Sequence, residues 1–228
     1  MAIRFLRLLL PILYLLAGCG EQERPAASIA SGGAIMKLGA GMQWIGRVQR
    51  SSGGSPYFDT LRIDSTFHGD SLEWFHFEEL SGTRAPRPDW LEGEWAALGT
   101  DGLHTTRLQS HPDSGAPLLR RFANPAATGD TMVDFGTFQE LSIEGAPVER
   151  LREIGVVTAI EEDVEVPAGR YTAFRVDLTR SSDRGGGAPL HGVMYDRLWF
   201  APGPGLVRAE SHVDSAHVDQ VWELVGVK

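Results

Sequence analysis

The chain has very little cysteine: Cys19 is the single cysteine among 228 residues, so no disulfide can form within it. Exported proteins commonly use disulfides for stability, and this chain must rely instead on apolar burial and backbone pairing. Hydrophobic residues make up 42% of the composition, and six tryptophans are among them. This content excludes a disordered chain and predicts one domain with a sizeable core.

Recognisable catalytic and metal-binding motifs are also missing from the body of the chain. It contains no nucleophile elbow, His-Glu-x-x-His sequence, P-loop, EF-hand loop or Cys/His metal spacing. The sequence therefore predicts no enzymatic activity, no cofactor and no metal. Basic residues are scarce too, with 21 Lys and Arg against 30 Asp and Glu. Because such a surface repels nucleic acid, we exclude nucleic acid as a partner.

Residues 1–18 have the pattern of a signal peptide. Arg4 and Arg7 give a positive start, and residues 8–16 form a short apolar stretch. This stretch cannot cross a bilayer core, which needs about 20 residues, but its length suits an export signal. We therefore expect residues 1–18 to be removed after export.

The segment Leu16-Ala17-Gly18-Cys19 ends this leader with small residues before the cysteine. It resembles the lipobox of bacterial lipoproteins. The resemblance implies a diacylglyceryl thioether on Cys19, cleavage before it and acylation of the new amino terminus. Several acyl chains on one residue would anchor the protein stably to a membrane. The alternative is an uncleaved anchor in which the cysteine occurs by chance.

The residue after the cysteine is Gly20. In well-studied enterobacterial lipoproteins, an aspartate there retains the protein at the inner membrane. The resemblance therefore favours the outer membrane, with the domain in the periplasm or at the cell surface. Residues 19–41 are polar and small, which predicts a flexible tether, and residues 42–228 form a single β-rich domain.

The period-two pattern predicts strands throughout the body. In residues 156–166 we expect one apolar face formed by the even-numbered positions, with Glu162 as its single misfit. Val166-Pro167-Ala168-Gly169 predicts a tight turn, because proline presets the first turn position and glycine allows positive φ. A second strand follows, with Phe174, Val176 and Leu178 on one side. This pair is the clearest hairpin in the sequence.

Similar strand signals recur along the chain with short turns between them. They occupy about residues 61–67, 72–79, 95–98, 103–108, 193–200, 206–213 and 217–227. Such spacing predicts an all-β fold with little α structure, an antiparallel meander forming a strongly curved sheet or half-barrel. The strand at 192–200 is apolar on both faces, so it must be covered twice. A loop, a short helix or a hydrophobic ligand could supply the second cover.

Two stretches carry a further resemblance. Val166-Pro167-Ala168-Gly169-Arg170-Tyr171 and Trp199-Phe200-Ala201-Pro202-Gly203-Pro204-Gly205-Leu206-Val207 resemble a pattern in secreted bacterial proteins of unknown function. The resemblance covers roughly the last 65 residues and implies a curved half-barrel like that of the lipoprotein-localisation carriers. It implies architecture more than activity.

Three sets of residues are candidates for a site. Trp74 and Trp199 are candidates for lining a ligand cavity, although core packing is the usual role of large aromatics. The run Glu161-Glu162-Asp163 could share acid and base roles, but carboxylates at strand edges are usually solvated. The segment 212–219 holds two histidines and two aspartates; since it falls at a predicted turn, we interpret it as structural.

Three functions remain open. The first is a membrane-tethered module that binds or carries a hydrophobic ligand. The second is a structural or interaction protein of the envelope, with a filled core and a protein partner. The third is a hydrolase acting through the carboxylates at 161–163. The anchor at Cys19 predicts where the domain works but not what it does there.

Overall fold

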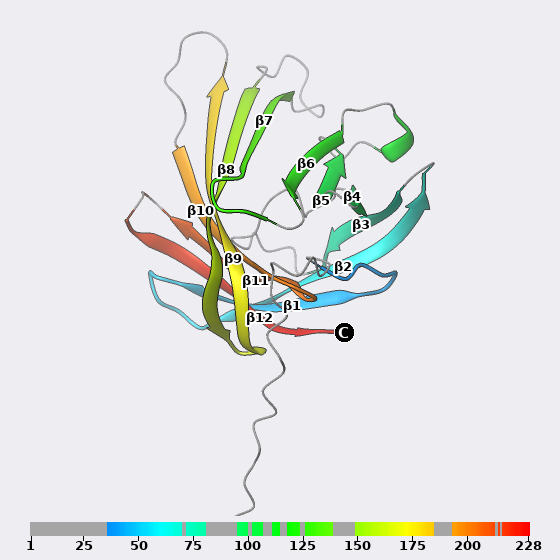
Figure 1. The fold of residues 1–228 in the computed structure, drawn as a ribbon. Helices are drawn as coiled ribbons and strands as arrows, with labels where there is room; N and C mark the ends of the chain where they lie inside the picture. The colour runs from blue at the N-terminus through cyan, green and yellow to red at the C-terminus, as the bar shows by residue number, and fades with distance from the viewer. Residues whose placement is uncertain are drawn as a thin grey trace, which may run out of the picture.

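The computed structural model describes residues 36–69, 72–80, 95–99, 102–106, 111–114, 118–123, 126–138, 149–184, 193–212, 214 and 216–228. These residues form one antiparallel sheet of twelve strands (Figure 1). A single turn of 3-10 helix, η3 (Pro112–Ser114), is the helical element among them, and no helix in this described part is long and apolar enough to cross a membrane. The strands are β1 (Gln43–Arg50), β2 (Tyr57–His68), β3 (Glu73–Glu79), β4 (Trp95–Gly99), β5 (Gly102–Thr106), β6 (Leu118–Ala123), β7 (Thr131–Phe138), β8 (Glu149–Val166), β9 (Gly169–Arg184), β10 (Val193–Ala201), β11 (Gly205–His212) and β12 (Val218–Val227).

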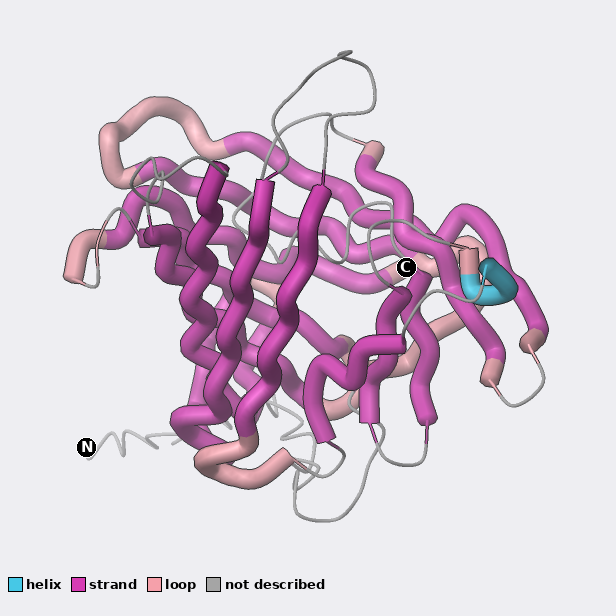
Figure 2. Tube along the Cα trace, turned by 90° about the horizontal axis from the view of Figure 1, so that it is seen from above, coloured by secondary structure: helices cyan, strands magenta, loops and turns pink. Residues whose placement is uncertain are grey.

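The strand order is β6-β5-β4-β3-β2-β1-β12-β11-β10-β9-β8-β7. Each half of the chain is a meander, and the pairing of β1 with β12 joins the two halves in the middle of the sheet. The sheet curves strongly around a common interior, as the view from above in Figure 2 shows. Strands β6 and β7 are its two edges, so it is curved but not closed. The predicted all-β, strongly curved antiparallel fold is confirmed.

The β8–β9 hairpin forms at the predicted turn. Strand β8 ends at Val166 and β9 begins at Gly169, its cross-strand partner, with Pro167 and Ala168 between them. Gly169 has φ of 132°, a conformation that a residue with a side chain rarely adopts. The local chemistry of proline and glycine was therefore sufficient to locate this turn.

The predicted single apolar face of residues 156–166 is wrong in its first half. Val157 is 2% exposed, whereas Ile160 is 37% exposed. The pairing with β9 shifts between Val157 and Ala159, and again between Ala159 and Glu162. Each shift inserts an extra residue into β8, and a bulge of this kind resets the alternation and bends the strand.

One face of the sheet carries a row of buried residues that lie directly opposite one another on five consecutive strands. Val176, Leu198, Ala209, Trp222 and Val48 are cross-strand partners in that order and are at most 5% exposed. We call this the inner face. The buried cluster that contains this row includes residues from both halves of the sheet, β1–β6 and β7–β12. The curvature of the sheet therefore encloses the cluster.

Trp222 packs on the inner face over Gly46. A Cβ atom added to Gly46 would lie 2.0 Å from Trp222 Cε2, so the indole occupies the space that any other residue would need. The indole Nε1 donates a hydrogen bond to Asp59 Oδ2 at 3.2 Å, and Asp59 is 1% exposed. Glycine at position 46 therefore allows a tryptophan and a buried carboxylate to meet in the core.

The packed core extends back to Met36, within the segment predicted as a tether. Met36 is 2% exposed and forms an isolated bridge with Pro204. Lys37 N donates to Gly203 O at 2.9 Å, and Trp44 Nε1 donates to Pro204 O at 2.7 Å. The N-terminal segment is thereby fixed to the turn between β10 and β11.

Candidate functional site

The face opposite the buried row, the outer face, carries charged residues of both signs. Arg175, Trp199, Arg208, Glu223 and Arg47 lie directly opposite one another on β9, β10, β11, β12 and β1. Directly opposed residues in neighbouring strands share a face. We call this row, with the acidic residues that pair with it, the outer-face ladder.

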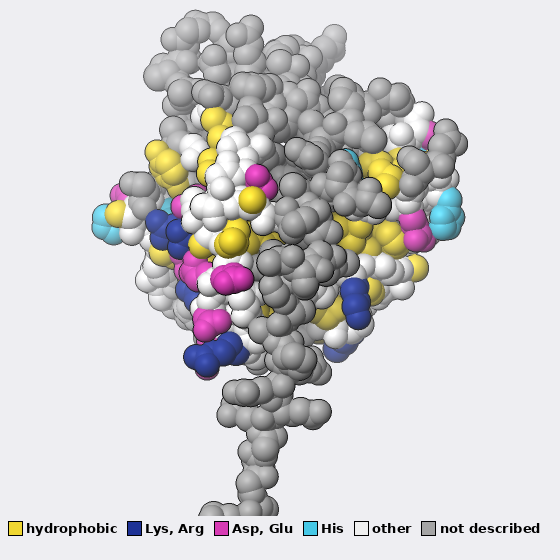
Figure 3. Space-filling view, viewed as in Figure 1, with side chains coloured by type: hydrophobic (Ala, Val, Ile, Leu, Met, Phe, Trp, Pro, Cys, Tyr) yellow, Lys and Arg dark blue, Asp and Glu magenta, His cyan; other side chains and the backbone are white. Residues whose placement is uncertain are grey.

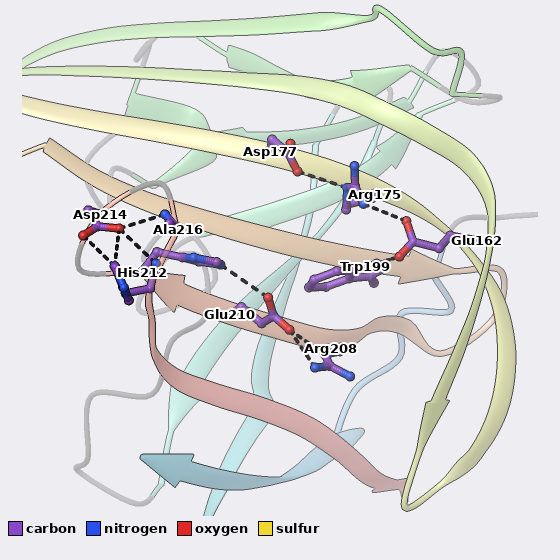
Figure 4. Close-up of polar contacts among 10 residues, drawn as sticks. Glu162, Arg175, Asp177, Trp199, Arg208, Glu210, His212, Asp214 and Ala216 are labelled. Atoms are coloured by element: carbon purple, nitrogen blue, oxygen red, sulfur yellow. Dashed lines mark hydrogen bonds and ion pairs between the residues drawn. The ribbon is translucent and has the colours of Figure 1, made fainter. Parts of the chain in front are cut away.

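Ion pairs connect the residues of the ladder. Arg208 Nη2 lies 2.6 Å from Glu210 Oε1 on the same strand (Figure 4). Arg47 Nη2 lies 2.7 Å from Glu223 Oε2 on the neighbouring strand. Arg208 also lies 3.8 Å from Glu223. Because Glu223 lies directly opposite both Arg208 and Arg47, opposite charges meet across three neighbouring strands and stabilise one another. In Figure 3, acidic and basic side chains are likewise interspersed along the β8–β9 hairpin at the left.

Glu162 joins the bent end of the hairpin to the ladder. Its carboxylate accepts a hydrogen bond from Arg175 Nη1 at 3.1 Å and another from Trp199 Nε1 at 3.0 Å. The Arg208 guanidinium lies over the Trp199 ring, 5.4 Å from its centroid. The residue that breaks the apolar pattern of β8 is therefore a hydrogen-bond acceptor for the outer face.

Trp199 is 5% exposed although it lies opposite the inner-face row, so β10 is covered on both sides as predicted. The second cover is the chain itself: Glu162 binds the indole, and Val164 belongs to the same buried cluster. At the tip of the hairpin, Ala168 N donates to Leu224 O on β12 at 3.0 Å. The two bulges in β8 permit this bend.

The two cavity candidates do not lie together. Trp74 is 4% exposed on β3, and Trp199 is on β10, with β2, β1, β12 and β11 between their strands. The cavity-lining role of these tryptophans stays a prediction.

The carboxylate run at 161–163 does not form a shared acid–base pair. Glu161 and Asp163 are exposed, whereas Glu162 is half-buried and bound to Arg175 and Trp199. Thr172 Oγ1 donates to Asp163 Oδ1 at 3.4 Å. The arrangement directs Glu162 toward protein groups rather than toward a substrate.

The segment 212–219 divides into a turn and a buried histidine. Asp214 Oδ1 accepts hydrogen bonds from Ala216 N at 2.8 Å and His217 N at 2.9 Å. These backbone bonds, together with the His217 side chain, lower the pKa of Asp214 from its ordinary value of 3.8. These are the hydrogen bonds expected of an aspartate in a turn. Across the described residues, no three His, Cys, Asp or Glu side chains are grouped so as to hold a metal.

His212 has a different environment from the turn that follows it. Its side chain is 2% exposed, and neither ring nitrogen has a hydrogen-bond partner. Nε2 lies 3.3 Å from Glu210 Oε2 at the end of the outer-face ladder. The sequence alone could not show that His212 is buried at the end of a strand, because polar residues of the turn follow it directly.

A second cluster on the outer face was not predicted from the sequence. The rings of Phe67, His76 and His111 all contact Trp95, with centroids 4.9–6.4 Å from it. His76 Nδ1 lies 2.6 Å from Asp64 Oδ1. Burial raises the pKa of Asp64, but the hydrogen bonds from His76 and Ser65 outweigh this effect and leave it below 3.8.

The residues that carry the resemblance to secreted bacterial proteins have structural roles. Gly203 and Gly205 have φ of 94° and 77° in the β10–β11 turn. A Cβ on Gly205 would lie 2.6 Å from Met36 Cε, so this glycine makes room for the N-terminal segment. In the other stretch, Tyr171 packs against the core and its hydroxyl donates to Ala168 O at 3.3 Å.

Comparison with known proteins gives two similar solved structures. No family model matches the chain, and no curated protein matches it. One structure is of a candidate lipoprotein from Parabacteroides distasonis, with 14% identity and a TM-score of 0.48. The other is of a candidate exported protein with a YmcC-like fold from Bacteroides fragilis, with 14% identity and a TM-score of 0.46. Each match covers 86% of this chain and 99% of the other chain.

Proposed function

We propose that the chain is a lipid-anchored protein of the bacterial envelope, acylated on Cys19 and held at the outer membrane. The lipobox-like segment ending at Cys19 supports this proposal, as does the absence of any other cysteine. The packing of Met36 adds a length limit. Roughly 17 residues separate the two positions, which span at most about 60 Å when fully extended. The domain therefore works close to the membrane surface.

Acylation is tested by replacing Cys19 in cells. Cys19→Ala should abolish incorporation of an alkyne-labelled fatty acid and leave the precursor uncleaved. The matched control is Cys19→Ala combined with Ser28→Cys, which restores a thiol outside the lipobox and should not restore labelling. Labelling of the single variant would overturn the anchor.

For the role of the domain, we propose an interaction protein that presents its outer face to another envelope component. The observation that carries this proposal is the closed inner face. Its row of opposed side chains, which includes Leu198 and Trp222, is at most 5% exposed. The outer face, by contrast, presents ordered charges held by the ion pairs of the ladder. Ordered charges of both signs give specificity to an interface more than raw affinity.

The test uses a photo-crosslinking amino acid in cells. Phe58 is the cross-strand partner of Arg47 at the end of the ladder and is 61% exposed. A crosslinker at Phe58 should capture one dominant protein, and the charge reversal Arg47→Glu should reduce that product. The control position is Ser52, exposed in the β1–β2 turn. Equal products from both positions, or none from Phe58, would overturn the proposal.

A further inference from the structure

Arg197 lies between two acidic residues, each of which already forms an ion pair with another arginine. It is the direct cross-strand partner of Asp177 on β9 and of Glu210 on β11. Asp177 Oδ1 lies 3.1 Å from Arg175 Nε, and Glu210 Oε1 lies 2.6 Å from Arg208 Nη2. None of the ion pairs in the described part of the chain includes Arg197. Its half-buried guanidinium therefore has donors to offer to a ligand.

The adjacent row supplies further donors on the same face. Thr179, Tyr195 and His212 are direct cross-strand partners on β9, β10 and β11. Tyr195 is two residues from Arg197 along β10, so both side chains lie on the outer face. Opposed side chains have Cβ atoms about 5 Å apart, and alternate residues of a strand lie about 7 Å apart. The register thus places four side chains from three strands at adjacent positions of one face.

His212 points to a ligand rather than to simple packing. A polar side chain that is 2% exposed normally has its hydrogen bonds made by the protein. Neither nitrogen of His212 has such a partner, and Nε2 lies near Glu210 without a hydrogen bond. The Nδ1 atom in particular is buried and unpaired. A bound group that accepts a hydrogen bond would satisfy it.

The donor set fits an anion. A guanidinium, two hydroxyl groups and an imidazole can all donate hydrogen bonds, and the flat guanidinium matches two oxygens of a phosphate or carboxylate at once. The neighbouring acids Asp177 and Glu210 each form an ion pair with an arginine of the ladder. Their charge therefore does not oppose an anion at Arg197 as strongly as free carboxylates would.

We infer that Arg197, Tyr195, Thr179 and His212 form a binding site for a phosphate or carboxylate group on the outer face. This inference rests on the proposed role of that face and names the chemistry that it recognises. A phosphate could come from a lipid headgroup or from a soluble molecule. In both cases Arg197 binds two oxygens, and the remaining three side chains fix the orientation of the group.

The experiment uses the full-length protein purified in a non-ionic detergent. Inorganic phosphate and acetate are titrated by calorimetry. At least one should bind saturably, and Arg197→Gln should weaken that binding at least tenfold. Arg170→Gln is the matched control, because Arg170 is exposed at the start of β9, away from this row, and should bind as the unaltered protein does. Tyr195→Phe removes a single hydroxyl and should weaken binding several-fold.

A second arm identifies the source of the anion. Flotation with phosphatidylglycerol vesicles, compared with phosphatidylcholine vesicles, should depend on Arg197 if the group is a lipid phosphate. If Arg197→Gln weakens anion binding in the calorimetry but does not change flotation with vesicles, the ligand is a soluble anion. Thermal unfolding of each variant confirms that it folds. Absence of binding to both anions, or equal binding by Arg197→Gln, overturns the site. If the anion site is overturned but the crosslinker at Phe58 still captures one dominant protein, the proposed interaction role is retained.

Discussion

Replacing Gly46 by alanine places a methyl group inside the volume of the Trp222 indole. The new Cβ would lie 2.0 Å from Trp222 Cε2 and Nε1 and 2.5 Å from Cζ2. The close atoms belong to a flat ring that is 2% exposed and bonded to the buried Asp59, so it has little freedom to move. We therefore expect either a shift of β1 or a displaced indole.

The magnitude follows from two costs. Overpacking a well-filled core costs about 1–3 kcal/mol. Weakening the hydrogen bond from Trp222 to Asp59 adds about 1 kcal/mol, because the carboxylate is buried. Gly46→Ala should thus lower the free energy of unfolding by about 2–4 kcal/mol, out of a total of about 5–15 kcal/mol. For a domain of this size the midpoint of thermal unfolding should fall by roughly 10 °C.

The assay is urea and thermal unfolding followed by tryptophan fluorescence, with Gly226→Ala as the matched control. Gly226 lies in the neighbouring strand opposite Ile45, and a Cβ there would meet nothing within 4 Å. The control should change stability by less than about 0.5 kcal/mol. In the double variant Gly46→Ala with Trp222→Leu, the loss should be smaller than the sum of the single losses. If Gly46→Ala matches the control, the packing described for the inner face is refuted.

Three further predictions concern other contacts. Asp64→Asn should destabilise the protein at pH 7. Because the folded-state pKa of Asp64 lies below its ordinary 3.8, the contribution of its carboxylate to stability is fully present above pH 3.8 and is lost as the pH falls through the folded-state pKa, so the difference in urea midpoint between the two proteins should shrink as the pH is lowered below 3.8. Gly205→Ala, at φ of 77° and against Met36, should cost about 1–3 kcal/mol in urea unfolding, and an unchanged midpoint would contradict the account of the N-terminal segment. Trp199→Phe removes the indole hydrogen bond to Glu162 and should cost about 1 kcal/mol, whereas a stabilised variant would contradict the described contact.

Local chemistry explains which parts of the fold could be predicted from the sequence. The Pro167-Ala168 turn was predictable because proline and glycine restrict the backbone by themselves. Alternation predicted most of the strands, although β1, β6 and β7 fall outside the predicted ranges. The doubly apolar strand β10 predicted cover on both faces. The bulges at residues 157–162 could not be predicted, because a bulge depends on how two strands align and not on either strand alone.

The candidate site could not be predicted from the sequence for a related reason. Arg175, Trp199 and Arg208 lie on three different strands and are brought side by side by the register in which β9, β10 and β11 pair. Pairing of β1 with β12 extends that row to Arg47, and it joins opposite ends of the chain. Among the described residues, Arg197 is left without an ion pair because Asp177 and Glu210 pair with Arg175 and Arg208. Such contacts follow from the register and cannot be deduced from composition or spacing.

The central claim is that the sheet is filled on its inner face and acts through its outer face. Native mass spectrometry of the full-length protein, extracted from cells in a mild detergent, tests this claim most directly. We expect the mass of the mature polypeptide with its covalent acyl groups and no additional hydrophobic molecule. A lipid retained at one copy per chain, and lost when Leu198 or Trp222 of the inner face is replaced by alanine in a variant that still folds, would contradict the account and favour a hydrophobic-ligand carrier.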